Sequence, residues 1–184
     1  MSFDQTLSAH IYHITKSSWV LRPVAIFCST SLLFMMIAAV VFSCSSVDCD
    51  VNLWWRVRGS LFTIGFPLFM AWLVTFGLQK LVKRERPFEN GHGAPLIQMV
   101  WKEPSFPSAH AAIAFATAAV SLYLFSDLFG PWLFVAAFVV ALSRVAVGVH
   151  YVSDVVFGGI LGFVVGSASW YGLMWLFFMT SWFH

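Results

Sequence analysis

Long apolar runs, separated by short polar stretches, dominate the pattern of this chain. A membrane-spanning helix needs roughly 20 predominantly apolar residues. Five windows fit that description, and they predict spanning helices over residues 23–43, 61–79, 108–126, 132–149 and 154–180. The last window predicts either one tilted helix or a helix followed by an interfacial tail, since Gly166 and Gly172 offer places to bend.

The N-terminal residues 1–20 follow a different pattern. Apolar side chains are mixed there with the polar ones of Asp4, His10, His13 and Lys16, which indicates a helix lying in the membrane interface. The stretch lacks the basic, apolar and small-residue regions that together make a signal peptide. The whole pattern predicts an all-α integral membrane protein, a bundle of about five transmembrane helices plus an N-terminal interfacial helix.

Composition agrees with a membrane-embedded chain. Hydrophobic residues make up 60% of the 184 residues, charged residues only 10%, and the mean hydropathy is +0.83. Soluble domains average about 45–50% apolar and about 25% charged residues. Because no internal repeat is visible, we expect a single domain over residues 1–184. The net charge of +2, without an extended basic surface, excludes nucleic acid as a partner.

Polar residues beyond the N-terminal helix concentrate in loops that share one membrane face. With five spans, the loops at 80–107 and 144–153 fall on the same face as the N-terminus. The fragments "RERP", "PSAH" and "SRVAVGVHYVSD" therefore meet at one end of the predicted bundle. Charged side chains in or beside a bilayer are costly, so their gathering there indicates a functional site.

Each fragment also has an ordinary structural interpretation. "RERP" alone is a juxtamembrane basic cluster whose proline ends a helix. Ser108 after Pro107 fits a helix N-cap, which accounts for the serine but not for His110. In the third fragment His150 and Asp154 lie four residues apart, so they share a helix face, and neither suits a membrane segment without a function.

Together the fragments contain the groups that phosphoryl transfer needs. Two histidines can act as nucleophile and general acid, and a carboxylate near one of them can hold its tautomer. Arginines, a serine hydroxyl and a helix N-terminus can bind a tetrahedral oxyanion. No acidic cluster is available for magnesium, so we expect catalysis by fixed positive groups through a phosphohistidine, without metal or cofactor.

The fragments resemble the ordered motifs of the type 2 phosphatidic acid phosphatase superfamily. The third fragment matches completely, with Ser143 and Arg144, five intervening residues, His150, three further residues and Asp154. The second fragment differs only at Ala109, where the family has glycine, and this change replaces one small residue with another.

The first fragment departs further from the family motif. The family has a lysine seven positions before the arginine that corresponds to Arg86, and that position is Gln79 here. Under this resemblance, either the neighbouring Lys80 takes the role of the family lysine from an adjusted helix end, or Lys83 takes that role.

The resemblance implies a role for each matched residue. His150 would attack the phosphorus, Asp154 would orient His150 and raise its basicity, and His110 would protonate the leaving oxygen and then activate water. Residues 80–107 would form an active-site loop over the head group. The implied phosphate-binding residues are Lys80, Arg86, Pro87, Ser108, Ala109, Ser143 and Arg144, with Ser143 either supporting Arg144 or serving in packing.

The size of the chain and its opening "FDQTLSAHIYHITKSSW" are most similar to the short bacterial undecaprenyl diphosphate phosphatases of the bacitracin-resistance type. This resemblance implies hydrolysis of undecaprenyl diphosphate to undecaprenyl phosphate and phosphate. Phosphatidylglycerophosphate, phosphatidic acid and lipid A 1-phosphate stay as alternative substrates. Alternatives of other kinds are a non-catalytic membrane protein or transporter with a buried polar network, and a metal site on His110, His150 and Asp154. The oligomeric state is left open.

Two arguments about membrane orientation oppose each other. Apart from Arg86 and Arg144, the motif face carries more basic residues than the other face, which has Arg56 and Arg58. Those on the motif face are Lys16, Arg22, Lys80, Lys83, Arg84 and Lys102. The positive-inside rule then puts the motifs in the cytoplasm, whereas the resembling phosphatases act on the outer face. We follow the resemblance and expect a multi-pass protein of the bacterial inner membrane with a periplasmic active site. Cys49 would then be cytoplasmic and reduced.

Overall fold

The computed structural model describes residues 2–45, 53–91, 93–98, 103–125 and 129–181. In these ranges the regular secondary structure is all helical and includes no strand, which confirms the predicted all-α class. The helices in chain order are α1 (Phe3–Ser17), α2 (Leu21–Thr30), α3 (Leu32–Ser45), α4 (Leu53–Val82), α5 (Ala109–Leu124), α6 (Phe129–Ala146) and α7 (Val152–Ser181).

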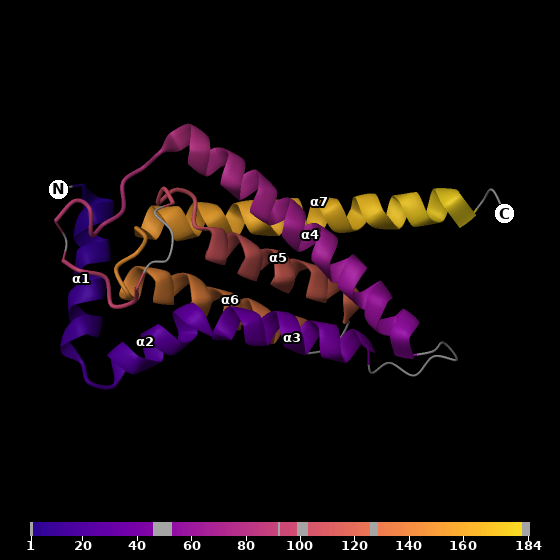
Figure 1. The fold of residues 1–184 in the computed structure, drawn as a ribbon, viewed down its shortest axis with the longest axis horizontal. Coiled ribbons are helices and arrows are strands. Elements are labelled where there is room, and N and C mark those ends of the chain that lie inside the picture. The colour runs from indigo at the N-terminus through magenta and orange to yellow at the C-terminus, as the bar shows by residue number, and fades with distance from the viewer. Residues whose placement is uncertain (1, 46–52, 92, 99–102, 126–128, 182–184) are drawn as a thin grey trace.

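The helices α2 to α7 run along the length of the molecule, and α1 crosses one end of this bundle (Figure 1). The loop after α4 and the turn between α6 and α7 lie at that same end, together with the N-terminus. The far end of α7 lies at the opposite end of the bundle. The three motif fragments therefore lie at one end of the bundle, as predicted.

The number of spans differs from the expected five. Among the described residues, three helices are long and apolar enough to cross a membrane, within Val57–Val82, Phe129–Ala146 and Val152–Met179. A fourth span is possible if α2 and α3, which meet at a 48° bend, are counted as one. The 16 residues of α5 reach only about 24 Å at 1.5 Å per residue, short of the roughly 30 Å hydrocarbon core.

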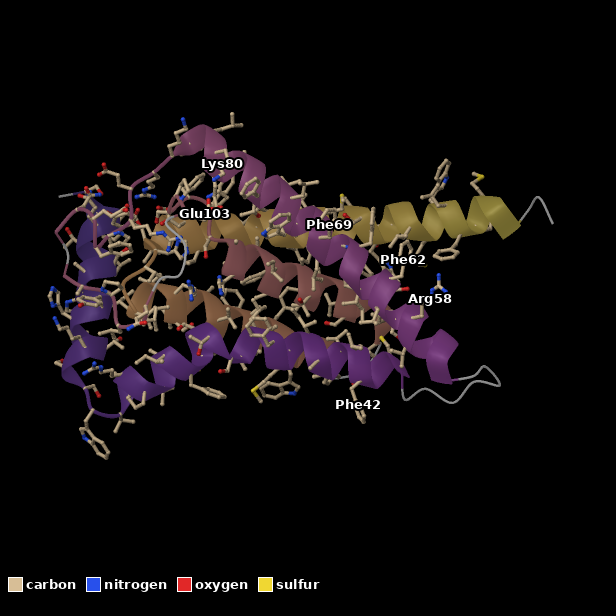
Figure 2. The ribbon with its side chains drawn as sticks, in the orientation of Figure 1. Phe42, Arg58, Phe62, Phe69, Lys80 and Glu103 are labelled. Atoms are coloured by element: carbon tan, nitrogen blue, oxygen red, sulfur yellow. The ribbon has the colours of Figure 1, made fainter. Side chains whose placement is uncertain are left out.

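The shortness of α5 has a physical reason in its surroundings. Ala112, Ala114, Ala118 and Val120 have no exposed surface at all, because other helices enclose α5. Irregular backbone at membrane depth is tolerated where protein, rather than lipid, surrounds it. By contrast, the aromatic side chains of Phe42, Phe62 and Phe69 are more than half exposed and point away from α3 and α4 (Figure 2).

Small residues at every fourth position bring α7 against α5. A Cβ added to Gly162 would lie 2.0 Å from the carbonyl oxygen of Ala112, and one added to Gly166 would lie 2.9 Å from the Cα of Ala116. Such spacing of small residues allows two helix backbones to approach closely in a membrane. Gly166 therefore serves packing rather than bending, and α7 continues through it as one helix.

Tyr12 of α1 contacts both the loop after α4 and the turn between α6 and α7. Its hydroxyl donates to the carbonyl of Ala94 in the loop after α4, at 2.6 Å. Its ring covers Gly148, whose φ of +80° favours glycine and where an added Cβ would lie 2.8 Å from the ring. The same loop pairs with the α6–α7 turn through the N–H of Leu96 and the carbonyl of Val147, at 3.0 Å. Three segments distant in sequence are thus held together at the motif end.

Candidate active site

One pocket of about 620 Å³ contains residues from all three motif fragments. We call it the polar pocket, and its charged or titratable lining includes Arg86, Glu103, His110, Arg144 and His150. Aromatic side chains from α3 and α4 complete part of its wall, namely Phe34, Trp72 and Phe76. The pocket therefore combines groups that bind an anion with a wall suited to hydrocarbon.

His150 lies in the turn between α6 and α7 and is 2% exposed. Its Nδ1 lies 2.7 Å from the backbone carbonyl oxygen of Ser105. A carbonyl only accepts, so Nδ1 carries the hydrogen and Nε2 keeps its lone pair. Burial, assisted by the positive charges of Arg86 and Arg144, lowers the pKa of His150 to about 4, although Asp154 acts in the opposite direction. Near neutral pH the side chain is therefore uncharged, with a lone pair on Nε2.

Asp154, which the resemblance implies orients His150, makes no direct hydrogen bond to it. Its Oδ2 lies 3.7 Å from Nδ1 of His150, beyond hydrogen-bond distance. The reason is that its oxygens have other donors: Arg84 at 2.7 Å on Oδ1, and the Ser105 hydroxyl and the Tyr151 N–H on Oδ2. Ser105 connects the two side chains, since its hydroxyl binds Asp154 while its carbonyl binds His150.

The two motif arginines are oriented by backbone carbonyls. Nε of Arg86 donates to the carbonyl of Glu103 at 2.7 Å, and one Nη donates to that of Val149 at 3.3 Å. Arg144 donates from Nη1 to the carbonyl of Ser29 at 3.0 Å, but its buried Nε has no hydrogen-bond partner. A buried donor without an acceptor is costly, so this geometry is suited to an anionic ligand.

Ser108 occupies the N-cap position of α5, as predicted, but its hydroxyl makes no capping bond. The hydroxyl is buried and has no hydrogen-bond partner. The expected free N–H of Ser108 is not available, because it donates to the carbonyl of Asp154 at 3.0 Å. Ala109 lines the polar pocket.

Ser143 and Pro87 lie apart from the lining of the polar pocket. The Ser143 hydroxyl donates to the carbonyl of Val140 at 2.6 Å, within the same helix. This bond favours the packing alternative over support of Arg144. Pro87 is buried directly after Arg86, past the end of α4.

Lys80 is not a lining residue of the polar pocket, contrary to our expectation. Its Nζ lies 3.0 Å from a carboxylate oxygen of Glu103 and 4.8 Å from the ring centre of Phe76 (Figure 2). Gln79 lines the pocket instead and donates from Nε2 to the carbonyl of Pro107 at 2.8 Å. Successive helical side chains point about 100° apart, so Lys80 cannot take over the direction of Gln79. Lys83 is exposed as well.

Several residues around Asp154 were missed at the level of sequence. Arg84, Asp4 and Ser105 form its hydrogen-bonded surroundings, directly or through one another. Arg84 was counted only as a basic loop residue, and Asp4 only as a polar residue of an interfacial helix. A charge two positions before the motif arginine Arg86 was the one available signal for Arg84.

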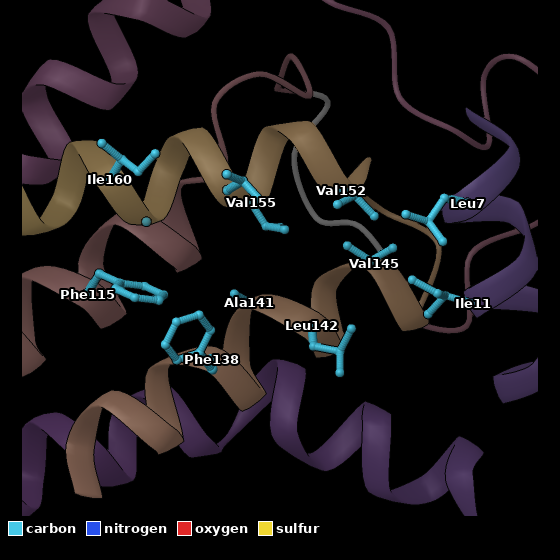
Figure 3. A pocket seen from close by; sticks show the side chains of 12 residues that line it. Leu7, Ile11, Phe115, Phe138, Ala141, Leu142, Val145, Val152, Val155 and Ile160 are labelled. Atoms are coloured by element: carbon cyan, nitrogen blue, oxygen red, sulfur yellow. The ribbon is translucent and has the colours of Figure 1, made fainter. Parts of the chain in front are cut away.

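A second pocket, of about 340 Å³, lies between α1, α6 and α7 (Figure 3). Its lining is apolar throughout and includes Leu7, Ile11, Leu142, Val156 and Ile160. It offers no group that would bind phosphate. In the part of the chain that the structure describes, no three His, Cys, Asp or Glu side chains are arranged to hold a metal ion. The polar pocket is therefore the candidate active site.

Comparison with known protein families agrees with these motifs. The sequence model of the PAP2 superfamily matches residues 6–178. The chain belongs to the PAP2 superfamily. This confirms the resemblance to the type 2 phosphatidic acid phosphatases that the three fragments indicated.

Among curated PAP2 relatives, the decaprenylphosphoryl-5-phosphoribose phosphatase of Mycobacterium tuberculosis is 35% identical over 113 residues, covering 61% of this chain and 60% of that protein. The Escherichia coli protein provisionally named undecaprenyl-diphosphatase YbjG is 31% identical over 112 residues, covering 61% of this chain and 56% of that one. The matched region thus spans about three fifths of the length of these relatives.

Solved PAP2 structures share the fold. Aquifex aeolicus LpxE superposes with a TM-score of 0.64 at 22% identity, covering 86% of this chain and 91% of that one. The transmembrane PAP2-type phosphatidylglycerolphosphate phosphatase from Bacillus subtilis superposes with a TM-score of 0.66 at 23% identity, covering 90% and 82%. The chain is therefore an all-α membrane protein of the PAP2 fold.

Proposed function

We propose that this PAP2 protein is a metal-independent lipid phosphatase that works through a phosphohistidine. The observation that carries the proposal is the polar pocket, where two histidines and two buried arginines meet. The buried Nε of Arg144 lacks an acceptor there, and a phosphate oxygen would supply one. Arginine is suited to this task because its planar fork matches the oxygens of a phosphate.

In the first step, Nε2 of His150 attacks the terminal phosphorus of the lipid. The new N–P bond forms as the P–O bond to the lipid breaks. His110, which takes up a proton from water when the phosphate anion binds beside it, gives that proton to the departing oxygen. The carbonyl of Ser105 holds Nδ1–H, which keeps the lone pair on Nε2 directed at the pocket. Arg86 and Arg144 stabilise the charge on the transferring group.

In the second step, water replaces the histidine on phosphorus. His110, now neutral, takes a proton from the attacking water, the N–P bond breaks, and inorganic phosphate leaves. His150 returns to its uncharged form. The aromatic wall of Phe34, Trp72 and Phe76 would accommodate the hydrocarbon next to the head group, since Phe34 and Trp72 are exposed on the membrane-facing surface of α3 and α4.

For the substrate, we propose undecaprenyl diphosphate, which would yield undecaprenyl phosphate and phosphate. The support comes from the opening of the chain and from relatives whose names refer to polyprenyl phosphates. Phosphatidylglycerophosphate, phosphatidic acid and lipid A 1-phosphate are the competing substrates, and the Bacillus subtilis protein of the same fold is named for the first of them.

Phosphate release from a panel of these lipids by purified protein tests the proposal. We expect release to be fastest from undecaprenyl diphosphate and to persist with a strong chelator present. Faster release from another lipid would change the substrate, and loss of activity to the chelator would support a metal site. No release from any lipid would favour the non-catalytic or transporter alternative.

We further propose that the protein lies in the bacterial inner membrane with the polar pocket on the periplasmic side. Cys49, which lies outside the described residues, would then be cytoplasmic. In a variant that keeps only this cysteine, an impermeant thiol reagent should label lysed but not intact cells. A matched variant with His10→Cys, at an exposed position of α1, should be labelled in intact cells. The reverse pattern would put the pocket in the cytoplasm.

A further inference from the structure

Arg84 sits between two carboxylates that come from opposite ends of the chain. Its Nη1 donates to Oδ1 of Asp154 at 2.7 Å, and its Nη2 donates to Oδ2 of Asp4 at 2.8 Å. The guanidinium also lies 4.2 Å from the ring centre of Tyr151, a cation–π arrangement. Arg84 precedes the phosphate-binding Arg86 by two residues, yet it turns away from the lining of the polar pocket.

The first two backbone N–H groups of α7 are bound by side chains of α1. The N–H of Ser153 donates to Oδ1 of Asp4, and the N–H of Val152 donates to the hydroxyl of Ser8, both at 3.0 Å. Burial raises the pKa of Asp4, but hydrogen bonds from Ser153 and Arg84 outweigh it and hold that pKa below its usual value. Asp4 is therefore a charged cap at a helix N-terminus, where negative charge is favoured.

We propose that Arg84 and Asp4 are positioning residues that hold the Asp154 carboxylate in place beside the nucleophile His150. This inference rests on the proposed function, because it assigns roles at the same site. Asp154 has no exposed surface, and a buried carboxylate keeps its charge only with good partners. Arg84 neutralises it and fixes Oδ1, which leaves Oδ2 to bind Ser105, the residue whose carbonyl holds His150.

The arrangement divides the arginines of the site by task. Arg86 and Arg144 line the polar pocket and face the phosphate, whereas Arg84 faces the carboxylate behind the nucleophile. The charged and titratable groups that surround Asp154 and His150 are Asp4 of α1, Arg84 and Arg86 of the loop, His110 of α5 and Arg144 of α6. Within the described residues, Arg84 forms an ion pair with each of the two aspartates.

The pH dependence of kcat in Arg84→Gln tests the proposal. Without the guanidinium, Asp154 loses the partner of its Oδ1 and can turn toward His150. A nearer carboxylate favours the protonated, inactive form of His150, which then persists to a higher pH. We expect the acid limb of kcat to move up by about one pH unit or more, with KM changed less than kcat. Arg84→Lys, which keeps one charge, should restore the limb in part, and Asp4→Asn should shift it less in the same direction. Arg22→Gln, which removes an exposed arginine from α2, is the matched control.

A merely structural role would lower the folded fraction without moving the limb. Thermal unfolding is therefore measured at each pH used for the kinetics. If Arg84→Gln is folded and the acid limb of its kcat lies at the wild-type pH, the inference is wrong. If Arg84→Gln does not fold, Asp4→Asn decides in the same way. Titration of His150 by NMR in protein with isotopically labelled histidine needs no turnover, so it decides even if no lipid is hydrolysed. A midpoint shared by wild type and the folded variant would contradict the positioning role, independently of the proposed function.

Discussion

The His150→Ala protein is expected to release phosphate from its lipid substrate at least about 1000-fold more slowly than wild type, because loss of a nucleophile removes the covalent route altogether. The buried side chain is held by one hydrogen bond to the carbonyl of Ser105, so its removal leaves the arginines in place. Lipid binding should therefore survive when turnover is lost. Phosphate release and lipid binding, measured on the same preparation, separate these two effects.

The control for this substitution is His10→Ala, since His10 is an exposed histidine of α1. It should retain wild-type turnover. Brief mixing with radiolabelled substrate, followed by alkaline denaturation, should leave label on wild-type protein and none on His150→Ala. Equal turnover by wild type and His150→Ala, or label that persists in the variant, would show that another residue is the nucleophile.

The low pKa of His150 has consequences for pH. Its pKa is about 4 in the folded protein, against an ordinary 6.5, so the side chain stays uncharged well below neutral pH. Between those two values the unfolded chain binds more protons than the folded one. The free energy of unfolding is therefore not reduced by this histidine above pH 6.5, and it falls as the pH is lowered from 6.5 toward 4.

Gly162→Ala is expected to lower the free energy of unfolding by about 2 kcal/mol or more, because overpacking in a filled core costs about 1–3 kcal/mol. The added Cβ would lie 2.0 Å from the carbonyl oxygen of Ala112. Backbone cannot move aside as the end of a flexible side chain can, so α7 must separate from α5. Turnover should fall too, since this contact brings His110 of α5 toward the first turn of α7.

The matched control is Gly172→Ala on the same helix, where an added Cβ meets nothing within 4 Å. That change should be neutral or slightly stabilising, because alanine is favoured over glycine in a helix by about 1 kcal/mol. Thermal unfolding of both variants in detergent measures the difference. Similar unfolding temperatures for the two would show that the α5–α7 contact can widen without cost.

Much of this architecture follows from the sequence pattern. The apolar windows all correspond to helices, and the alternation of spans brings the three motif fragments to one end of the bundle (Figure 1). The site residues His110, Arg144 and His150 meet in one pocket, because motif spacing and chain direction together determine where they lie. The packing role of the α7 glycines was missed, because Gly166 was interpreted from the sequence as a place to bend.

What the sequence did not reveal depends on tertiary contacts. The choice between Gln79 and Lys80 depends on the rotation of α4 about its axis, which hydropathy alone does not define. The partners of Asp154 come from residues far away in the chain, and a long arginine side chain can point in many directions before packing selects one. α5 can be short because other helices enclose it. An apolar window in the sequence does not show which helices will surround it, so this length could not be predicted.

The contacts between α1 and later segments also determine when the site can form during synthesis. α1 is made first, but the groups it binds near Ala94 and Gly148 and in the first turn of α7 are made much later. Until α7 is made, Asp4 and Ser8 lack the backbone N–H groups of Ser153 and Val152 that they bind in the finished protein. The candidate active site is therefore completed late in biogenesis, and a half-inserted chain carries the proposed catalytic residues before they are held in position.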